Sequence, residues 1–591
     1  MLECDLVLKG GVTSGVVYPQ AIVEVARKYR LRNVGGTSAG AIAAAVAAAA
    51  EYRRQSSPGI DDFSGFDATA AIAKELGEDL LGLFQPSPPL AGVFAIGIEL
   101  LGAEKKHRAW RVARTVARVF PWHFAVPAAV TVMLVVFAAP TENWALMALG
   151  TLLGTLMLFG SLAWSLGRTV LQTLPRHDFG ICSGLSQPGF AKDSASPTAA
   201  LTEWLADKID VVAGRDPSGT PLTVGELEAK GVRVAAVTTD LSSRRPYELP
   251  LKSRHHFFSK AEFELLFPKR VIDYLVEGQE PLSGASPPDL FQLKVGAEFP
   301  VILVARMSLS FPGLIRAVPL YRFDDQLPAE GGDRGRVRRC LFSDGGISSN
   351  FPIHFFDTFL PRRPTFGITL TDWNAARHRE IRVFLPKRWR QSTDLPIAPI
   401  VGLGDFAGSI LQTAREWQDT LQSLLPGYAE RIVEVRLDPE KEGGLNLTMS
   451  KGTIENLVEY GRQAGTTLTS QFDFDEHRWR RALSLLPELE TTLRGFATSH
   501  ASRPDGADPD ALTYAAILGE YEPRSYENPA PWRETVLAPF ASALADIGTA
   551  AQDRLGCTPV ETVVEGTVPA VDSTIRLMAA TDRAPRRSTE G

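Results

Sequence analysis

The sequence is poor in cysteine and carries no excess of positive charge. Its 591 residues include four cysteines, no CxxC pair occurs, and no histidine completes a zinc-ligand pattern with any of them. A disulfide framework is therefore excluded, and a structural metal site is not expected. The 62 Lys+Arg against 68 Asp+Glu give a formal net charge of −6, which argues against a nucleic-acid-binding surface spread over the molecule.

Three familiar sequence signals are also missing. The first five residues carry two acids and no basic residue, so they do not resemble a signal peptide, and we expect the globular part in the cytoplasm. A Walker A loop is excluded because Val16 follows Gly15. The dinucleotide pattern G-x-G-x-x-G is excluded because Val12 occupies its second glycine position. The chain shows no internal repeat, and no cofactor is expected.

The N-terminal segment alternates strand and helix patterns. A hydrophobic content of 45% is ordinary for a globular protein. A buried strand is expected at 5–8, a helix at 16–29, a second strand at 31–34 and an alanine-rich helix at 41–50. A glycine-rich turn follows each strand. This order predicts a parallel α/β layer architecture.

The same pattern resumes from about residue 193. We expect an amphipathic helix and a capping box there, followed by short buried strands; these are the helix 202–212, the box Thr223 to Glu226, and strands 232–237, 301–303, 341–342, 366–370 and 432–435. The tail beyond about Ser499 is rich in Pro, Asp and Ala, and its last ten residues are expected to be disordered.

Two uncharged apolar runs occupy the middle of the chain. Residues 119–141 and 143–167 contain no Asp, Glu, Lys or Arg, and each is long enough to cross a bilayer. A polar turn, Pro140 to Asn143, joins them, so they predict a transmembrane hairpin; Gly150, Gly154 and Gly160 suit close packing in lipid. The alternative is a pair of core helices in a large soluble domain.

Basic residues flank the hairpin and are missing from its turn. Lys105 to Arg118 precede the first run, and Arg168 and Arg176 follow the second, so the positive-inside rule places both ends in the cytoplasm. The basic stretch is either an interfacial helix that contacts anionic lipid or only the topological flank of the first span.

The segment Gly36-Thr37-Ser38-Ala39-Gly40 matches G-x-S-x-G, the nucleophile elbow. A serine on a sharp strand-to-helix turn adopts a strained conformation, and small neighbours let the backbone pass close to it. Its position between an apolar strand and an alanine-rich helix favours Ser38 as a nucleophile over a chance match.

Two further glycine-rich turns carry candidate chemistry. Gly10 to Gly15, directly after the first strand, exposes successive backbone N–H groups that suit an oxyanion, although a plain turn has the same composition. Ser343-Asp344-Gly345-Gly346 can hold a carboxylate rigidly in a cleft, although Asp and Gly are also ordinary turn residues.

The general base is either Asp344 or a histidine that follows it. An α/β-hydrolase triad requires a histidine after the acid, and the candidates by order are His354, His378, His477 and His500. In that fold, however, the nucleophile follows several strands, whereas Ser38 follows two. A Ser–Asp dyad, in which Asp344 accepts the Ser38 proton, fits the order better.

These motifs together resemble the patatin-like phospholipase family. That family combines an N-terminal glycine-rich oxyanion loop, a G-x-S-x-G elbow and a later D-G-[GA] motif; the segments 235–240 and 306–312 resemble it as well. The resemblance covers roughly 5–82 and 190–470. It departs in the oxyanion loop, where Val12 replaces the third glycine and Ser14 the basic residue. Ser38 and Asp344 lie 306 positions apart, further than is usual for the family, and the hairpin insertion accounts for the excess.

The resemblance implies a fold and a site. The fold is an α/β class, patatin-like three-layer α/β/α sheet with an inserted two-helix transmembrane hairpin and a helical C-terminal tail. Its parts are 1–85 and 191–480 (catalytic domain), 86–190 (insertion) and 481–591 (C-terminal extension). The implied site residues are Ser38 and Asp344 (catalytic), Gly10, Gly11 and Val12 (oxyanion hole), and Gly15, Gly36, Gly40, Gly345 and Gly346 (motif support).

The implied activity is hydrolysis of acyl esters in membrane phospholipids by a bilayer-anchored enzyme that needs neither metal nor cofactor. The catalytic domain would lie on the cytoplasmic side, with no nucleic acid among its partners. Two alternatives stay open: a soluble α/β hydrolase with a Ser-His-Asp triad, and a membrane effector that keeps the fold without turnover. The altered loop at Val12 and Ser14 is the feature that favours the second.

Overall fold

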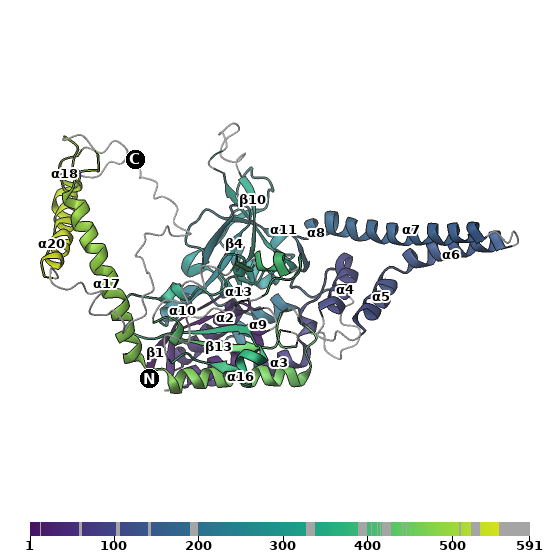
Figure 1. Ribbon diagram of the computed structural model, residues 1–591, viewed down its shortest axis with the longest axis horizontal. Helices are drawn as coiled ribbons and strands as arrows, with labels where there is room; N and C mark the ends of the chain where they lie inside the picture. The colour runs from purple at the N-terminus through teal and green to yellow at the C-terminus, as the bar shows by residue number, and fades with distance from the viewer. Residues whose placement is uncertain are drawn as a thin grey trace.

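A computed structural model describes most of the chain. The described residues are 1–11, 14–57, 62–101, 107–139, 144–188, 199–324, 326, 337–387, 397, 399–403, 405–410, 412–413, 415, 427–439, 441–444, 446–506, 510–521 and 532–554. They form an α/β domain, a pair of long helices that project from it, and a helical C-terminal segment (Figure 1). Val12, the turn 140–143 and the last ten residues lie outside the described residues.

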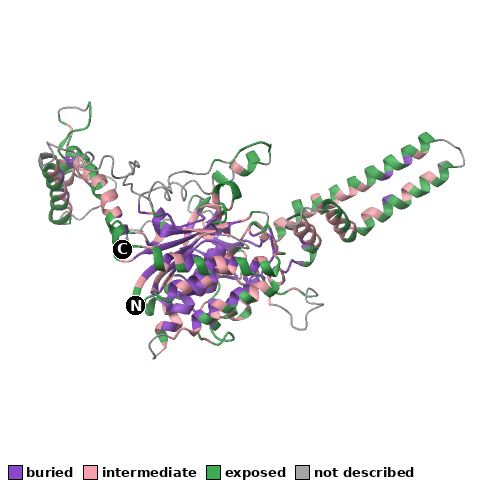
Figure 2. Cartoon of the chain, turned by 60° about the horizontal axis from the view of Figure 1, so that its bottom comes forward, coloured by how far each residue is buried: buried purple, intermediate pink, exposed green. Residues whose placement is uncertain are grey.

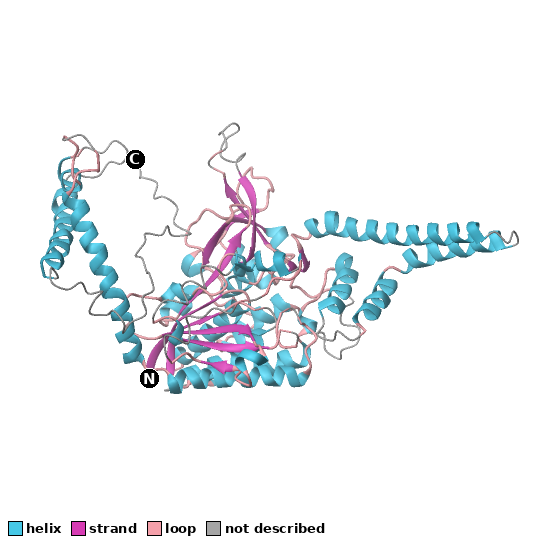
Figure 3. Cartoon of the chain, in the orientation of Figure 1, coloured by secondary structure: helices cyan, strands magenta, loops and turns pink. Residues whose placement is uncertain are grey.

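A large mixed sheet is the centre of the α/β domain (Figure 3). Within the described residues it has eleven strands in the order β12-β13-β11-β1-β2-β4-β10-β9-β6-β7, with β5 paired to β4. The neighbours β13, β11, β1, β2 and β4 run parallel, as expected, and the remaining pairings are antiparallel. The strands are β1 Leu2–Leu8, β2 Tyr29–Gly36, β4 Arg233–Asp240, β5 Arg245–Leu249, β6 Phe257–Ser259, β7 Leu290–Gln292, β9 Val318–Phe323, β10 Val337–Asp344, β11 Thr365–Asp372, β12 Val383–Phe384 and β13 Ile432–Leu437. A separate pair consists of β3 Gly180–Cys182 and β8 Gly313–Ile315.

Apolar side chains of the strands and helices form one main core (Figure 2). In β1, Leu6 and Leu8 belong to this core, while Val7 packs on the opposite face with Phe351, Ile353 and neighbours. The helices of this domain are α1 Tyr18–Ala26, α2 Ala39–Ser56, α3 Ser64–Asp79, α9 Leu201–Val212, α10 Val224–Ala229, α11 Lys260–Phe263, α12 Lys269–Val276, α13 Val301–Ser308, α14 Ala375–His378 and α16 Lys451–Gln471.

Two sequence expectations are wrong in detail. The run 301–303 is not a strand but the start of α13 (Val301–Ser308), because a short, fully buried apolar run has no periodicity that separates strand from helix. The helix expected at 16–29 ends at Ala26, and Tyr29 begins β2. The capping box is confirmed, since Thr223 Oγ1 accepts from the Glu226 amide at the start of α10.

A buried ion pair fixes α2 against β2, and therefore positions the turn between them. Arg54 and Glu51, both on α2, are paired and fully shielded from solvent. Arg54 also donates to the Tyr29 carbonyl at 3.0 Å, and Glu51 accepts from the Leu31 amide at 3.1 Å. Removing one partner of such a pair typically costs about 3–5 kcal/mol, because the other charge stays buried.

The insertion leaves and re-enters the α/β domain at one place. The Ser87 amide donates to the Ile181 carbonyl at 2.9 Å, and Pro86 and Cys182 form a bridge beside it. Between these points lie α4 Ala91–Leu101, α5 Arg108–Val119, α6 Pro121–Ala138, α7 Trp144–Arg168, the π-helix Thr169–Thr173 and α8 Leu174–Arg176.

The root of the insertion is tied to the strand that carries Asp344. Asp178, which is buried, pairs with Arg316 at 2.8 Å and with Arg339 at 2.6 Å. Arg339 lies on β10, whose last residue is Asp344. The position of the insertion is thus set by the same strand that positions the candidate base.

Helices α6 and α7 pack against each other and project away from the sheet (Figure 1). Gly150 and Gly154 of α7 form the close contact: a Cβ at either position would lie 3.0 Å from a side-chain carbon of Leu134 or Thr131, both on α6. Gly160, expected to help, has nothing within 4 Å. The remaining surface of the pair is largely exposed and apolar, so these helices add nothing to the α/β core (Figure 2).

Among the residues that the structure describes, one continuous helical segment, Trp144–Arg176, is long and apolar enough to cross a membrane, and 11% of its most apolar stretch is buried. Helix α6 is long and apolar enough to cross a membrane only when it is counted together with α5, and the two helices meet at a bend of 89°. The C-terminal segment consists of α17 Phe474–Ala501, α18 Tyr514–Glu520, a π-helical turn Arg533–Leu537 and α20 Ala538–Arg554.

Candidate active site

Ser38 stands on a strained turn between β2 and α2. Its backbone has φ 56° and ψ −126°, a conformation that a residue with a side chain rarely adopts. The flanking glycines make the turn possible: a Cβ on Gly36 would lie 2.8 Å from the Leu8 carbonyl oxygen, and one on Gly40 2.8 Å from the Lys9 carbonyl oxygen. The elbow expected from the sequence is therefore present in the backbone.

The Ser38 side chain lies at the N-terminus of α2, where backbone amides point out of the helix. The Ser38 amide donates to Ser308 Oγ at 3.1 Å, and this hydrogen bond ties the elbow to α13. Among the described residues, the Ala39 amide donates no backbone hydrogen bond. An amide directly after a nucleophilic serine is a common oxyanion donor, and the sequence analysis did not single it out.

Asp344 lies at the end of β10, and β10 and β2 both pair with β4. Its Oδ1 accepts from the Gly346 amide at 2.7 Å. Its Oδ2 is buried, and no donor among the described residues has both the distance and the angle of a hydrogen bond to it. A Cβ on Gly345 would lie 2.6 Å from the Val237 carbonyl carbon, so the glycine at 345 lets the turn pack against β4.

Burial raises the pKa of Asp344 to about 6, and the nearby Ser38 hydroxyl opposes this by lowering the pKa through hydrogen bonding. The Ser38 hydroxyl therefore neighbours the Asp344 carboxylate, whose Oδ1 already accepts from the Gly346 amide. Hydrogen bonds in unliganded active sites are often loose and tighten when substrate binds. A base with this pKa is mostly ionised at neutral pH and binds a proton more readily than an ordinary aspartate.

Gly10 and Gly15, at the two ends of the glycine-rich segment, lie against the elbow. A Cβ on Gly10 would lie 3.2 Å from the Ser38 Cβ, and one on Gly15 3.0 Å from the Ala39 Cβ. The Gly10 amide, expected in the oxyanion hole, instead donates to the Asn350 carbonyl at 2.9 Å. The Gly11 amide, like that of Ala39, donates no backbone hydrogen bond within the described part of the chain.

Asn350 is a further residue that the sequence analysis missed. It is buried, and its side-chain oxygen lies against Gly10 and 2.9 Å from where a Cβ on Gly346 would stand. It thus joins the oxyanion loop to the turn after Asp344. The only available sequence signal was its place four residues after Gly346, ahead of an apolar segment.

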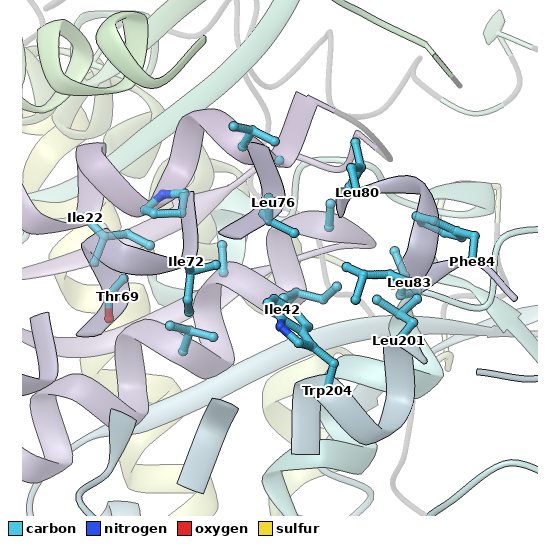
Figure 4. Close-up of a pocket in the computed structure, with 17 residues that line it drawn as sticks. Ile22, Ile42, Thr69, Ile72, Leu76, Leu80, Leu83, Phe84, Leu201 and Trp204 are labelled. Atoms are coloured by element: carbon cyan, nitrogen blue, oxygen red, sulfur yellow. The ribbon is translucent and has the colours of Figure 1, made fainter. Parts of the chain in front are cut away.

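An apolar pocket opens beside the elbow (Figure 4). Its lining includes Gly15, Ala39 and Leu309 near Ser38, and it encloses about 680 Å³ of atom-free space, part of it open to solvent. The rest of the lining is almost entirely aliphatic or aromatic and comes from α1, α2, α3, α9 and the segment that leads into the insertion; it includes Ile22, Ile42, Ala43, Val46, Ile72, Leu76, Leu80, Leu83, Phe84, Leu201 and Trp204. Such a pocket suits a hydrocarbon chain.

The histidines considered as bases lie elsewhere. His354 is exposed on a short 3-10 turn, His378 ends α14, and His477 and His500 are buried in α17. Burial and neighbouring arginines lower the pKa of His477 to about 3. The groups that shift the pKa of Asp344 include no histidine.

No protein-family model matches the chain. It is 34% identical over 589 residues to the RpoH suppressor of Rhizobium meliloti (strain 1021), with 88% of this chain and 91% of that protein covered. The chain belongs to the RpoH suppressor family. Among solved structures, VipD from Legionella pneumophila is similar over 97% of this chain and 94% of its own, with 12% identity and a TM-score of 0.26. That likeness is too remote to support an argument.

Proposed function

We propose that this protein is a membrane-anchored serine acyl hydrolase with a patatin-like three-layer fold, which hydrolyses acyl esters of membrane phospholipids. The observation that carries the proposal is Ser38 on its strained elbow, beside the buried Asp344 carboxylate and at the edge of an apolar pocket. A nucleophile, a base and a site for a hydrocarbon chain are thus together.

The proposed reaction has two steps. Ser38 Oγ attacks the ester carbonyl carbon while its proton passes to Asp344 Oδ2, and the bond to the alcohol breaks as that proton moves to the departing oxygen. Water then attacks the acyl-serine, gives its proton to Asp344, and releases the fatty acid as the Ser38 hydroxyl is restored. The proposal assigns the oxyanion to the Gly11 and Ala39 amides, which among the described residues donate no other backbone hydrogen bond. One such donor is typically worth about 3–4 kcal/mol.

Membrane anchoring rests on α6 and α7. The 25 residues of α7 span about 37 Å at 1.5 Å per residue, more than the hydrocarbon thickness of about 30 Å. Trp122 near the start of α6 and Trp164 near the end of α7 lie at the base of the pair, and Trp144 lies at its tip; all three are exposed. Tryptophans at both ends of an apolar pair suit the two bilayer interfaces.

The direct test is covalent labelling with a fluorophosphonate together with fatty-acid release from phospholipid vesicles. The wild-type protein should label and hydrolyse. Ser38→Ala should do neither, and Asp344→Asn should slow both by about 10²–10⁴-fold through loss of the base. Ser218→Ala, which removes an exposed loop hydroxyl, is the matched control and should behave as wild type. Labelling of Ser38→Ala at the wild-type rate would remove the basis of the proposal.

A second candidate is a membrane effector that keeps the fold without turnover. The observation that favours it is the Gly10 amide, which is engaged by Asn350 and so unavailable to an oxyanion in this conformation. A folded wild-type protein that neither labels nor hydrolyses any phospholipid class would support this candidate.

A further inference from the structure

Helix α5 (Arg108–Val119) has a basic stripe and carries no buried residue. Its arginines stand at positions 108, 111, 114 and 118, which is the three- and four-residue spacing of one helix side. The helix contains no acidic residue, and Trp110, Arg114 and Arg118 are exposed, Trp110 at 67%. Alanines and valines fill most of the remaining positions. This composition is typical of a helix at the boundary between water and an apolar phase.

The direction of α5 supplies an independent observation. It meets Pro121–Phe137 of α6 at 89°, with the break at Phe120 and Pro121. A proline at this point is expected to end the preceding helix. If α6 and α7 cross a bilayer along its normal, a helix at 89° to α6 lies in the plane of the membrane surface. The exposed Trp110, Arg114 and Arg118 are then at the depth of the lipid headgroups.

Helix α4 (Ala91–Leu101) joins α5 to the apolar pocket. Glu99 of α4 pairs with Arg111 at 3.1 Å, and Gly92 packs against Val119 at the other end of α5. Phe94 of α4 is buried in one apolar cluster with Leu83 and Phe84, which line the pocket. The pocket is thus connected to α5 through one packed helix.

We propose that α5 is an interfacial helix that binds the phosphate groups of anionic lipids and so holds the pocket at the bilayer surface. The proposal rests on the membrane anchoring argued above. Charge complementarity favours it, since Arg114 and Arg118 are exposed and form no ion pair within the described part of the chain. Continuity favours it as well, because α5 runs directly into the apolar pair. Docking of α5 shortens the path of an acyl chain from the leaflet to Ser38.

The test measures the depth of α5 in vesicles. The full chain with Cys557→Ser carries a spin label at an introduced Ala113→Cys, an exposed position of α5, while the three other cysteines are buried. It is reconstituted in phosphatidylcholine alone and in phosphatidylcholine mixed with phosphatidylglycerol. We expect the label to lie at the headgroup–acyl boundary in the mixed vesicles and closer to water in the neutral ones. A label at Ser218→Cys should stay in water in both.

Charge removal identifies the cause. Arg114→Gln/Arg118→Gln should return the label to water and lower phospholipid hydrolysis in the mixed vesicles roughly tenfold, because each basic residue near an anionic surface contributes to docking. Hydrolysis of a water-soluble short-chain ester should stay within about twofold of wild type. The matched control, Arg27→Gln/Lys230→Gln, removes two exposed charges from the α/β domain and should change neither quantity.

The proposal is overturned if the label lies at the same depth in the two vesicle types, or if its depth is unchanged in Arg114→Gln/Arg118→Gln. Either outcome is expected if α5 binds nucleic acid or protein instead of lipid. Depth is measured without turnover. A chain that hydrolyses no ester but shows charge-dependent insertion therefore refutes the hydrolase and supports the role of α5.

Discussion

Replacing Asp344 by asparagine should remove the base and also stabilise the protein above about pH 6. Burial raises the pKa of this carboxyl from 3.8 to about 6, so the folded state binds the proton more tightly than the unfolded state does. The wild-type protein therefore loses stability as the pH rises through this window, and the loss persists at neutral pH. Asparagine has similar volume and keeps an oxygen for the Gly346 amide, but it carries no charge.

The magnitude follows from the shift. A shift of about two pKa units, at 1.36 kcal/mol per unit, corresponds to roughly 3 kcal/mol. As the pH rises from about 4 to 7, the free energy of unfolding of Asp344→Asn should therefore gain roughly 3 kcal/mol relative to that of the wild type. For a cooperative unit of about 400 residues, with an unfolding entropy of about 2.1 cal/mol/K per residue, this corresponds to roughly 3–4 °C in Tm.

The assay is thermal unfolding of both proteins in the same detergent across this pH range. Asp216→Asn is the control of opposite sign, because hydrogen bonds from Ser218 lower the pKa of the exposed Asp216 carboxyl. Removing this carboxylate should lower the Tm at neutral pH, and the Tm difference from wild type should shrink as the pH falls. A Tm difference for Asp344→Asn that does not change with pH, or that shrinks as the pH rises, would refute the assignment of Asp344 as a buried carboxylate with a raised pKa.

Two further predictions concern the elbow and the pocket. Gly36→Ala and Gly40→Ala should each prevent correct folding around Ser38, seen as loss of folded protein by size-exclusion chromatography, because an added Cβ meets backbone at 2.8 Å or less. Gly97→Ala has nothing within 4 Å of its Cβ and should fold normally; equal yields of all three would contradict the steric argument. Ala43→Leu should fill part of the pocket and lower kcat/KM for long-chain esters relative to butyrate esters roughly 10- to 50-fold, at about 0.8 kcal/mol per displaced methylene. An unchanged chain-length profile would place the acyl chain elsewhere.

The sequence predicts those features that depend on local steric limits. The elbow is one, since Gly36 and Gly40 are required by backbone contacts within the strand–turn–helix unit and by β1 next to it. The parallel strands β1 and β2 are another, because each is a short apolar run that leads into a glycine-containing turn. The run 301–303 was misassigned, since burial on all sides removes the periodicity that identifies a helix.

Features made by distant segments could not be predicted. The engagement of the Gly10 amide by Asn350 joins positions 340 residues apart, and no local pattern signals it. The pocket is built from apolar residues such as Ile72 and Trp204, each of which has the pattern of an ordinary core position on its own helix. The right angle between α5 and α6 depends on packing against α4, although Pro121 marks where the break occurs.

The split of the active site around the insertion has a consequence for biosynthesis. Ser38 is translated before the apolar helices, and Asp344 follows it by 306 positions, after both of them. At about 5–20 residues per second the ribosome needs roughly 15–60 s to cover that interval. During this time Ser38 lacks Asp344 beside it, and β1 and β2 have not yet gained β10 or β11 in their sheet. The two apolar helices therefore leave the ribosome before Ser38 and Asp344 can meet. Under the proposed function, the chain would reach the membrane before it could hydrolyse an ester.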